Sequence, residues 1–384
     1  MKKIYTAFAF IVSFFLLSIT SIAQYKEWML VPFVKQDAVN PVLKPLKTQF
    51  TDPILKKKVG WEEKDVFNPA AVVRGNKIYL LYRAQDVIGL PAGTSRIGLA
   101  FSDDGLHFTR AKEPVLKPEN DEYKKFEWQG GCEDPRIVED NNGTYYMTYT
   151  AYDGTTARLF IATSKDLYHW KKHGSVFKNA EDGKYINYWS KSGSIVCKPV
   201  GSKLVAEKIN GKYWMYWGES NIYLATSSDL INWTPVPETD PSKKQYDSLR
   251  NYEAFKILFG TRNNKFDSEL VEPGPPAIIT NNGILFMYNS KNSPTRGDKS
   301  LPDGVYSAGQ ILADKNNPER VIDRSDNNFF IPDKEYEITG QINNVVFLEG
   351  LVYFKSKWFL YYGTADSKIA VAVHTPPAAK AAKK

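Results

Sequence analysis

The sequence contains only 2 Cys and 4 His among 384 residues, and this scarcity excludes several classes of protein. Two cysteines are too few for a disulfide scaffold. Cys132 and Cys197 could pair in an exported protein, but isolated cysteines in a large domain are more often small buried hydrophobes. The histidines show no metal-ligand spacing. Since there is also no nucleotide-binding loop and no Ser-His-Asp arrangement, no cofactor and no metal are implied.

The chain also lacks a large excess of positive or negative residues. The chain carries 50 Lys and Arg against 43 Asp and Glu, a formal charge of +7. The basic residues are spread along the chain, apart from the run 56–58 and a Lys-rich tail after about residue 376. Such short runs are typical of solvated surface or of a disordered end. We therefore expect no nucleic-acid partner.

A long hydrophobic run occurs only at the N-terminus, where residues 7–19 follow Lys2 and Lys3 and precede the small-residue exit at 21–23. This pattern predicts an export signal over residues 1–23 and a periplasmic or secreted protein. A membrane anchor is the alternative, but the run is shorter than the ~20 residues that a span needs. We expect no membrane contact once the signal is removed, and the sequence leaves the oligomeric state open.

Helical periodicity is almost absent, and what is present instead is a repeat of aromatic-rich strands after turn dipeptides. The repeat aligns five tyrosines: Tyr82, Tyr149, Tyr216, Tyr288 and Tyr362. A second motif runs in step, Ser-x-Asp-x-x-x-aromatic, beginning at Ser102, Ser164 and Ser227. Its Ser and Asp can cap a turn while the aromatic residue returns to the core.

Five units of about 70 residues, each with roughly four strands, predict an all-β fold, a five-bladed β-propeller. A β-sandwich does not explain the fivefold register. No Pro/Gly/Ser linker interrupts the repeat, so residues 24–384 are expected to form a single catalytic domain with a short disordered tail from about 376.

Polar residues follow every aligned tyrosine, and the pseudo-symmetry of a propeller brings them to one mouth of its channel. A ring of carboxylates, amides and guanidinium groups beside aromatic faces suits sugar hydroxyls. For Asp86 and Asp153, capping of loops is an equally open interpretation. The ring occupies residues 83–86, 150–153, 217–220, 289–292 and 363–366.

The string Gly-Gly-Cys-Glu-Asp-Pro-Arg at 130–136 opens the second unit. The glycines allow close backbone approach, Asp134 precedes a proline that cannot donate to a strand ladder, and Arg136 is placed to orient a carboxylate. Taken alone the string also fits a turn with a structural ion pair. At the head of a propeller strand it indicates a site.

Together these segments resemble glycoside hydrolase family 130, in order and with matching spacing from about residue 60 to 375. The segments that carry the resemblance are 67–70, 82–83, 96–100, 130–136, the Ser-x-Asp turns, 272–276, 336–340 and 362–366. The resemblance implies a five-bladed propeller that acts on β-mannosides with inversion, as a phosphorylase or a hydrolase. It implies that Asp134 is the general acid, passing its proton through the mannose 3-hydroxyl. Family positions that hold the mannosyl unit match Asn68, Arg83, Arg96, Glu337 and Asp366, and Tyr306 matches a sugar or water contact.

The chain departs from the phosphorylase pattern at three basic positions, where it has Trp217-Gly218, Leu270 and Asn289. Two carboxylates, Glu219 and Glu272, lie close by in sequence. Unit charges about 4 Å apart interact by roughly 4 kcal/mol at an effective dielectric of 20, which disfavours phosphate beside either carboxylate. An ionised Glu can instead deprotonate water in an inverting reaction.

We therefore predict an exo-acting inverting β-mannosidase that hydrolyses β-mannosides, with β-1,2 linkages favoured by resemblance. Asp134 is the predicted acid, and Glu219 and Glu272 are predicted to activate water, with the base undecided between them. The alternative is a β-mannoside phosphorylase that releases mannose 1-phosphate. A third reading, from another class, is a non-catalytic glycan-binding propeller. The expected partner in every case is a mannose-containing oligosaccharide.

Overall fold

The structure is a computed structural model that describes residues 25–89, 92–244 and 254–377. The predicted export signal at 1–23 and the last residues of the predicted tail lie outside these ranges. In the described residues, strands dominate and helical segments are short: α1 (Lys124–Glu127), η1 (Ala180–Gly183) and α2 (Glu335–Ile338). None of the helices in these ranges is long and apolar enough to cross a bilayer.

The first two blades are four-stranded antiparallel meanders. Each inner strand is followed by an aligned tyrosine on the second strand, Tyr82 in blade 1 and Tyr149 in blade 2. Blade 1 contains β4 (Asp65–Arg74), β5 (Lys77–Gln85), β6 (Ser95–Ser102) and β7 (Thr109–Arg110), and blade 2 contains β8 (Gly131–Glu139), β9 (Tyr145–Tyr152), β10 (Ala157–Ser164) and β11 (Lys171–Ser175).

The third and fourth blades are less regular. In blade 3 a further strand pairs with β16, and in blade 4 two short strands share the innermost position and both pair with β21. Blade 3 contains β12 (Ser194–Ile195), β15 (Tyr213–Trp217), β16 (Asn221–Ser227), β17 (Trp233–Pro235) and β18 (Ile257–Gly260), and blade 4 contains β19 (Leu270–Pro273), β20 (Ile278–Ile279), β21 (Ile284–Lys291), β22 (Tyr306–Ala313) and β23 (Val321–Arg324).

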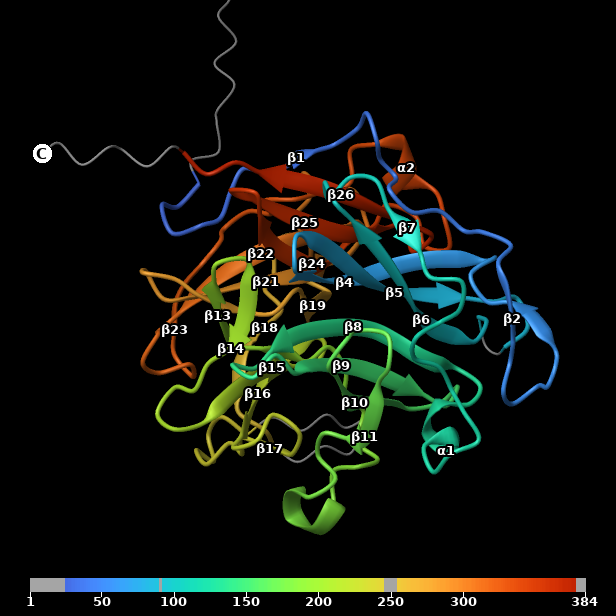
Figure 1. Ribbon diagram of the computed structural model, residues 1–384. Helices are drawn as coiled ribbons and strands as arrows, with labels where there is room; N and C mark the ends of the chain where they lie inside the picture. The colour runs from blue at the N-terminus through green and yellow to red at the C-terminus, as the bar shows by residue number, and fades with distance from the viewer. Residues whose placement is uncertain (1–24, 90–91, 245–253, 378–384) are drawn as a thin grey trace, which may run out of the picture.

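The fifth blade joins the two ends of the described chain. Its outermost strand is β1, which pairs antiparallel with β26 near the C-terminus (Figure 1). The other three strands come from the C-terminal part of the chain. Blade 5 therefore contains β24 (Val346–Phe354), β25 (Lys357–Thr364), β26 (Lys368–His374) and β1 (Val34–Lys35). The predicted five-bladed β-propeller is confirmed.

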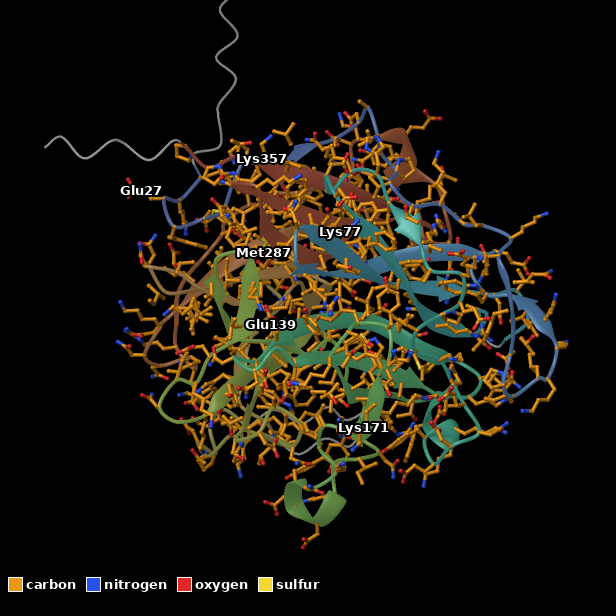
Figure 2. The ribbon with its side chains drawn as sticks, viewed as in Figure 1. Glu27, Lys77, Glu139, Lys171, Met287 and Lys357 are labelled. Carbon is orange, nitrogen blue, oxygen red and sulfur yellow. The ribbon has the colours of Figure 1, made fainter. Side chains whose placement is uncertain are left out.

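Two hairpins stand outside the blades: β2 (Gln49–Thr51) with β3 (Lys58–Gly60), and β13 (Cys197–Val200) with β14 (Lys203–Ala206). The second hairpin links blades 2 and 4, which flank blade 3, because β14 pairs in parallel with β8 and β13 with β20. The apolar cores lie between blades, where side chains fill the space between the ribbons (Figure 2). Cys132 and Cys197 are both free and buried, so they do not form a disulfide.

The aligned tyrosines share a contact that recurs in four blades. In each of them the tyrosine hydroxyl donates to a carboxylate with 0% exposure, at 2.8 to 2.9 Å, and the same carboxylate pairs with a cation 2.5 to 2.8 Å away. Buried charges are tolerated when they are paired and hydrogen-bonded in this way. We call these groups the tyrosine triads: Tyr82–Glu62–Arg110, Tyr149–Glu127–Lys172, Tyr288–Asp267–Arg324 and Tyr362–Glu337–Lys35.

Blade 3 lacks a triad, since the Tyr216 hydroxyl donates to the Pro318 carbonyl oxygen at 3.0 Å. The Ser-x-Asp turns behave as predicted. At the first of them, Ser102 Oγ accepts from the Asp104 and Gly105 amides, and Asp104 Oδ1 accepts from the next two amides. The turns that begin at Ser164 and Ser227 repeat this pattern. The spacing found in the sequence is therefore a structural signature of the blades.

Candidate active site

The inner strands of blades 1 and 2 are interrupted where the sequence places an Asx residue before proline. Asn68 has a φ of +48° and Asp134 a φ of +50°, and the ladder shifts register at each of them. This backbone region is costly for residues other than glycine and is typical of functional sites. A bulge of this kind re-aims the side chain. It brings the two residues together, since Asn68 Nδ2 donates to Asp134 Oδ1 at 2.9 Å.

Arg83, on β5 directly after the aligned Tyr82, binds both acids of the Glu133-Asp134 pair. Its Nη1 lies 3.1 Å from Asp134 Oδ1 and its Nη2 lies 2.6 Å from Glu133 Oε1. Burial alone would raise the pKa of Asp134, but Arg83, Lys191 and the Asn68 amide hold it at about 2. Burial raises the pKa of Glu133, against the pull of Arg83. The free site therefore keeps Asp134 ionised and places any shared proton on Glu133.

Lys191 is the cation at the centre of the second half of the site. Its Nζ lies 3.2 Å from Glu272 Oε1 and 3.6 Å from Glu219 Oε2, and Asp134 and Glu133 also act on its charge. Burial by itself lowers the pKa of Lys191, but these four carboxylates raise it above its ordinary value. The structure thus brings the two predicted carboxylates, Glu219 and Glu272, to one ammonium group.

Backbone contacts explain why Glu219 and Glu272 meet. The turn that carries Glu219 is held at both sides: the Gly218 amide donates to the Lys191 carbonyl at 3.0 Å, and the Ser220 amide donates to the Val271 carbonyl at 2.8 Å. Glu272 lies on β19, next to Val271, and accepts a hydrogen bond from Ser192 Oγ. Burial and the nearby Glu219 raise the pKa of Glu272, while Lys191 lowers it, and the net direction is upward.

Asp366 and Tyr306 border the same cluster. Asp366 lies in the turn between β25 and β26, where burial raises its pKa to about 7 against the opposing charge of Arg83. Tyr306 begins β22, and burial together with Asp366 and Glu272 raises the pKa of its hydroxyl. Several side chains of the cluster keep 11% to 18% exposure and so remain in reach of a ligand: Arg83, Glu133, Lys191 and Glu219.

Two of the predicted sugar contacts lie outside this cluster. Arg96 has 0% exposure and binds Asp52 at 2.7 Å and Asp86 at 2.8 Å. Glu337 is the carboxylate of the blade 5 triad, and its oxygens are bound by Tyr362, Lys35 and two backbone amides. The structure therefore places both within structural ion pairs, and their role in holding the sugar stays a prediction.

Asp86 and Asp153 illustrate the same distinction. Asp86 Oδ1 accepts from three backbone amides and its Oδ2 binds Arg96. Asp153 Oδ1 accepts from the Thr155 and Thr156 amides. Both carboxylates cap the loops in which they lie, which is the structural interpretation of the two left open by the sequence.

The sequence interpretation missed Lys191, Glu133 and the buried Glu349. The place of Lys191 is visible only in the structure, where it precedes Ser192, whose φ is +57°, at the start of the inner strand of blade 3. Blades 1 and 2 place Asn68 and Asp134 at the corresponding point. Glu349 has a signal in the sequence, because it is the only charged residue in the otherwise apolar inner strand β24.

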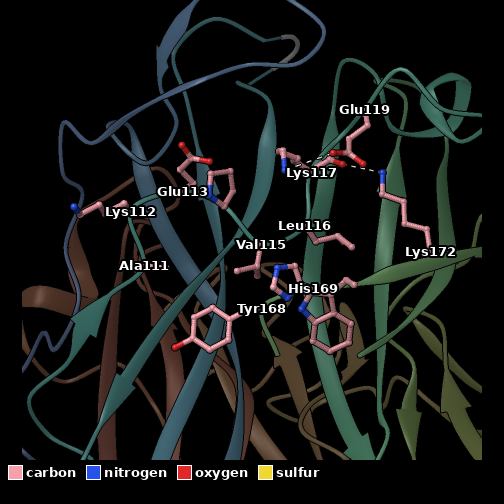
Figure 3. Close-up of a pocket in the computed structure, with 12 residues that line it drawn as sticks. Ala111, Lys112, Glu113, Val115, Leu116, Lys117, Glu119, Tyr168, His169 and Lys172 are labelled. Atoms are coloured by element: carbon pink, nitrogen blue, oxygen red, sulfur yellow. Dashed lines mark hydrogen bonds and ion pairs between the residues drawn. The ribbon is translucent and has the colours of Figure 1, made fainter. Parts of the chain in front are cut away.

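A cavity of about 580 Å³ lies away from this cluster, beside the outer strands of blades 1 and 2 (Figure 3). Its lining shares no residue with the cluster and includes Leu116, Lys117, Tyr168, His169 and Lys172. Lys172 belongs to the blade 2 triad, so this part of the lining has a structural role.

Comparisons with known proteins agree with this geometry. The family model described as beta-1,4-mannooligosaccharide phosphorylase matches residues 33–376. A 1,2-beta-oligomannan phosphorylase of Thermoanaerobacter sp. (strain X514) is 32% identical over 338 residues, which cover 85% of this chain and 96% of the relative.

Two solved structures are more similar still. A glycosyl hydrolase from Bacteroides ovatus is 47% identical with a TM-score of 0.87, covering 92% of this chain and 96% of that one. Another, also 47% identical with a TM-score of 0.87, covers 94% and 98%. It is described in a report that the family 130 mannoside phosphorylases contain glycoside hydrolases that target beta-1,2 mannosidic linkages in Candida mannan.

The names of the curated relatives correct the prediction of a hydrolase. The relative from Thermoanaerobacter and the beta-1,2-mannobiose phosphorylases of Thermoanaerobacter and Listeria innocua are all named as phosphorylases, which favours the alternative. The physical reason is that the sequence argument took both Glu219 and Glu272 as uncompensated anions. In the structure Lys191 lies between them, and burial raises the pKa of Glu272. The local repulsion of an anion is therefore weaker than the sequence suggested.

Proposed function

The chain belongs to glycoside hydrolase family 130 and is an enzyme that acts on β-mannosides, and we propose that it cleaves β-1,2-linked mannosides by inverting phosphorolysis. In this proposal phosphate takes up the mannosyl group and the product is mannose 1-phosphate. The cluster of Asp134, Arg83 and Lys191 is the observation that most supports it, because it joins a candidate acid to one cation that can hold the mannosyl unit, Arg83, and one that can hold a phosphate, Lys191.

Asp134 is the proposed general acid. In the free site its pKa of about 2 keeps it ionised, held by Arg83, Lys191 and Asn68. A bound sugar removes water from around the carboxylate, and desolvation of this kind raises a carboxyl pKa. We therefore expect Asp134 to take up its proton when the mannoside binds, and then to donate it toward the glycosidic oxygen.

The acceptor phosphate is proposed to bind beside Lys191, whose ammonium is a compact point charge. Glu272 is compatible with this position, because a carboxyl whose pKa is raised can hold a proton and donate a hydrogen bond to a phosphate oxygen. Asn68, Arg83, Tyr306 and Asp366 surround Asp134 and Glu272 and are the proposed contacts of the mannosyl unit.

The experiment that tests this proposal is product analysis with and without phosphate. The purified protein is incubated with β-1,2-mannobiose, and the products are separated by chromatography. We expect mannose 1-phosphate plus mannose with phosphate, and no turnover without it. Release of free mannose alone, at the same rate in the absence of phosphate, would overturn phosphorolysis while leaving cleavage intact. Absence of turnover on β-1,2-, β-1,3- and β-1,4-mannobiose under both conditions would overturn an enzymatic function.

A variant of Lys191 tests the phosphate site itself. Lys191→Met removes the charge but keeps most of the stem, so we expect the KM for phosphate to rise at least about tenfold with little change in the KM for mannobiose. Lys203→Met is the matched control. Lys203 pairs with Glu139 at 2.9 Å on the β13–β14 hairpin, away from the cluster. An unchanged KM for phosphate in Lys191→Met would contradict the assignment.

Export by residues 1–23 is also a proposal. An exported phosphorylase would release mannose 1-phosphate outside the cytoplasm, where the cell cannot use it directly. The product analysis with and without phosphate therefore decides between phosphorolysis and hydrolysis, whatever the location of the protein. N-terminal sequencing of the protein from cell fractions tests it: we expect the mature chain to begin at about residue 24. A cytoplasmic protein that retains Met1 or Lys2 would contradict it.

A further inference from the structure

Arg136, on the inner strand β8 of blade 2, reaches across to two other blades. Its side chain has 1% exposure, and its guanidinium donates to three backbone carbonyls: Nε to Gly274 at 2.8 Å, Nη2 to Pro273 at 2.5 Å and Nη1 to Asp134 at 3.1 Å. Two of these carbonyls follow Glu272 directly and the third belongs to the proposed acid. One planar group thereby connects the backbone of both halves of the site.

Glu349 faces Arg136 from the inner strand β24 of blade 5. Its Oε1 lies 3.1 Å from Arg136 Nη2, and its side chain has 0% exposure. Apart from this ion pair, neither of its oxygens has a hydrogen-bond partner in the described part of the chain. Burial, together with Asp134 and Glu272, raises the pKa of Glu349 well above its ordinary value, against the pull of Arg136. The 3.1 Å contact with Arg136 is thus the interaction that places the Glu349 carboxyl, and it also fixes the guanidinium from the side of blade 5.

The backbone around Glu349 is itself fixed. The ladder between β24 and β25 shifts register at this residue. The amide of Asn289, on β21 of blade 4, binds the Leu348 backbone twice: Nδ2 donates to its carbonyl at 3.0 Å, and Oδ1 accepts from its amide at 2.7 Å. At Gly274 an added Cβ would lie 2.8 Å from the Met287 carbonyl, so this turn can approach β21 only with glycine. The backbone carbonyls that accept hydrogen bonds from Arg136 therefore lie in segments whose positions are fixed by their neighbours.

We infer that Arg136 and Glu349 are positioning residues, which set the place of Asp134 relative to Glu272 by holding their backbone segments across three blades. The inference rests on the proposed function, in which these two carboxyl groups act on one substrate. Neither residue touches the sugar in this scheme. The charged groups that surround Glu349 are Arg136, Asp134, Glu272 and Lys191. Displacement of the pair therefore alters both the geometry and the charge of the site.

Two variants test the inference. Glu349→Gln keeps the shape but leaves only a neutral amide to face the guanidinium in place of the acid group, and Arg136→Lys replaces a three-way fork by a single ammonium. We expect kcat on β-1,2-mannobiose to fall about tenfold in Glu349→Gln and roughly a hundredfold in Arg136→Lys, because a misplacement of about 1 Å has such an effect. The KM for mannobiose should change less than about threefold, and the limbs of the pH profile of kcat should shift.

Glu62→Gln is the control for a purely structural loss, since it neutralises a carboxylate that is equally buried and paired with an arginine, in the blade 1 triad. We expect it to lower the melting temperature while leaving kcat and its pH profile as in the wild type. A folded Glu349→Gln protein whose kcat and pH profile match those of the wild type would overturn the inference. A wild-type protein with no turnover of mannosides would instead overturn the proposed function.

Discussion

The tyrosine triads and the central cluster use the same residue types to opposite effect. In each triad one carboxylate meets a tyrosine hydroxyl and a cation, and all four carboxylates have 0% exposure. In the cluster two cations, Arg83 and Lys191, face more carboxylates than they can neutralise, and several side chains remain partly exposed. In this protein, carboxylates that each pair with one cation stabilise the fold, whereas several carboxylates gathered around two cations mark the candidate active site.

Blade 3 differs from the other blades in how it takes part in the tyrosine triads and in the central cluster. It lacks a triad, since Tyr216 binds only a carbonyl, and it supplies Lys191 and Glu219 from the same end of its two innermost strands, just before β12 and just after β15. The blade without a triad is thus the one that contributes the central cation. Neutralising a charge should therefore have different consequences in the two regions: loss of activity in the cluster and loss of stability in a triad.

The largest effect is expected for Asp134→Asn in the cluster. Without the general acid we expect kcat on β-1,2-mannobiose to fall by about 10²–10⁴. The free energy of unfolding at neutral pH should fall by about 2 kcal/mol, because Arg83, Lys191 and Asn68 stabilise the ionised Asp134, whose pKa they lower to about 2, and the neutral amide loses this attraction. Steady-state kinetics and urea unfolding measure the two quantities. Near wild-type turnover would refute the role of Asp134, and severe unfolding would show that its charge is structural.

The opposite outcome is expected for Glu62→Gln in the blade 1 triad. Arg110 then keeps a buried charge without its anion, and breaking a buried pair in this way typically costs about 3–5 kcal/mol. The free energy of unfolding from urea titration should fall by about that amount, while kcat measured well below the melting temperature stays unchanged. A stability equal to that of the wild type would show that the triads do not stabilise the blades.

The difference between the two regions also decides what the sequence could predict. The propeller followed from the register of the aligned tyrosines and the Ser-x-Asp turns, because strand and turn chemistry is local. The convergence of Asp134, Glu219 and Glu272 followed from pseudo-symmetry and resemblance, but Lys191 did not, since its position depends on a backbone bond between Lys191 and Gly218. Likewise, the sequence shows that Glu337 is acidic but not that Tyr362 and Lys35 neutralise it.

A smaller, pH-dependent effect is expected for Asp366→Asn at the edge of the cluster. The pKa of Asp366 is raised from its ordinary 3.8 to about 7. As an ionised carboxylate it accepts hydrogen bonds from sugar hydroxyls, so kcat/KM of the wild type should rise as the pH increases through about 7. In Asp366→Asn this limb should disappear, and kcat/KM above pH 7 should be roughly tenfold lower. A limb that persists in the variant would assign it to another group.

The same variant has a stability signature of known sign. Folded Asp366 binds a proton between about pH 4 and 7 that the unfolded chain has lost, so its contribution to stability falls as the pH rises through this window. Asp366→Asn lacks this term and should gain stability relative to the wild type from pH 4 to pH 7. Glu127, whose burial raises its pKa to about 7, titrates in both proteins, so the difference between them isolates Asp366.

The smallest effect compares Tyr82→Phe in blade 1 with Tyr216→Phe in blade 3. The Tyr82 hydroxyl donates to the Glu62 carboxylate at 2.8 Å, and hydrogen bonds to charged groups contribute about 1.5–3 kcal/mol. The Tyr216 hydroxyl donates to the Pro318 carbonyl, a neutral bond of about 1 kcal/mol. Tyr82→Phe should therefore lower the free energy of unfolding by about 1 kcal/mol more than Tyr216→Phe, as measured by urea titration of both variants. Equal losses would mean that the carboxylate of the triad is stabilised by its arginine alone. The absence of a tyrosine–carboxylate hydrogen bond in blade 3 would then cost no stability.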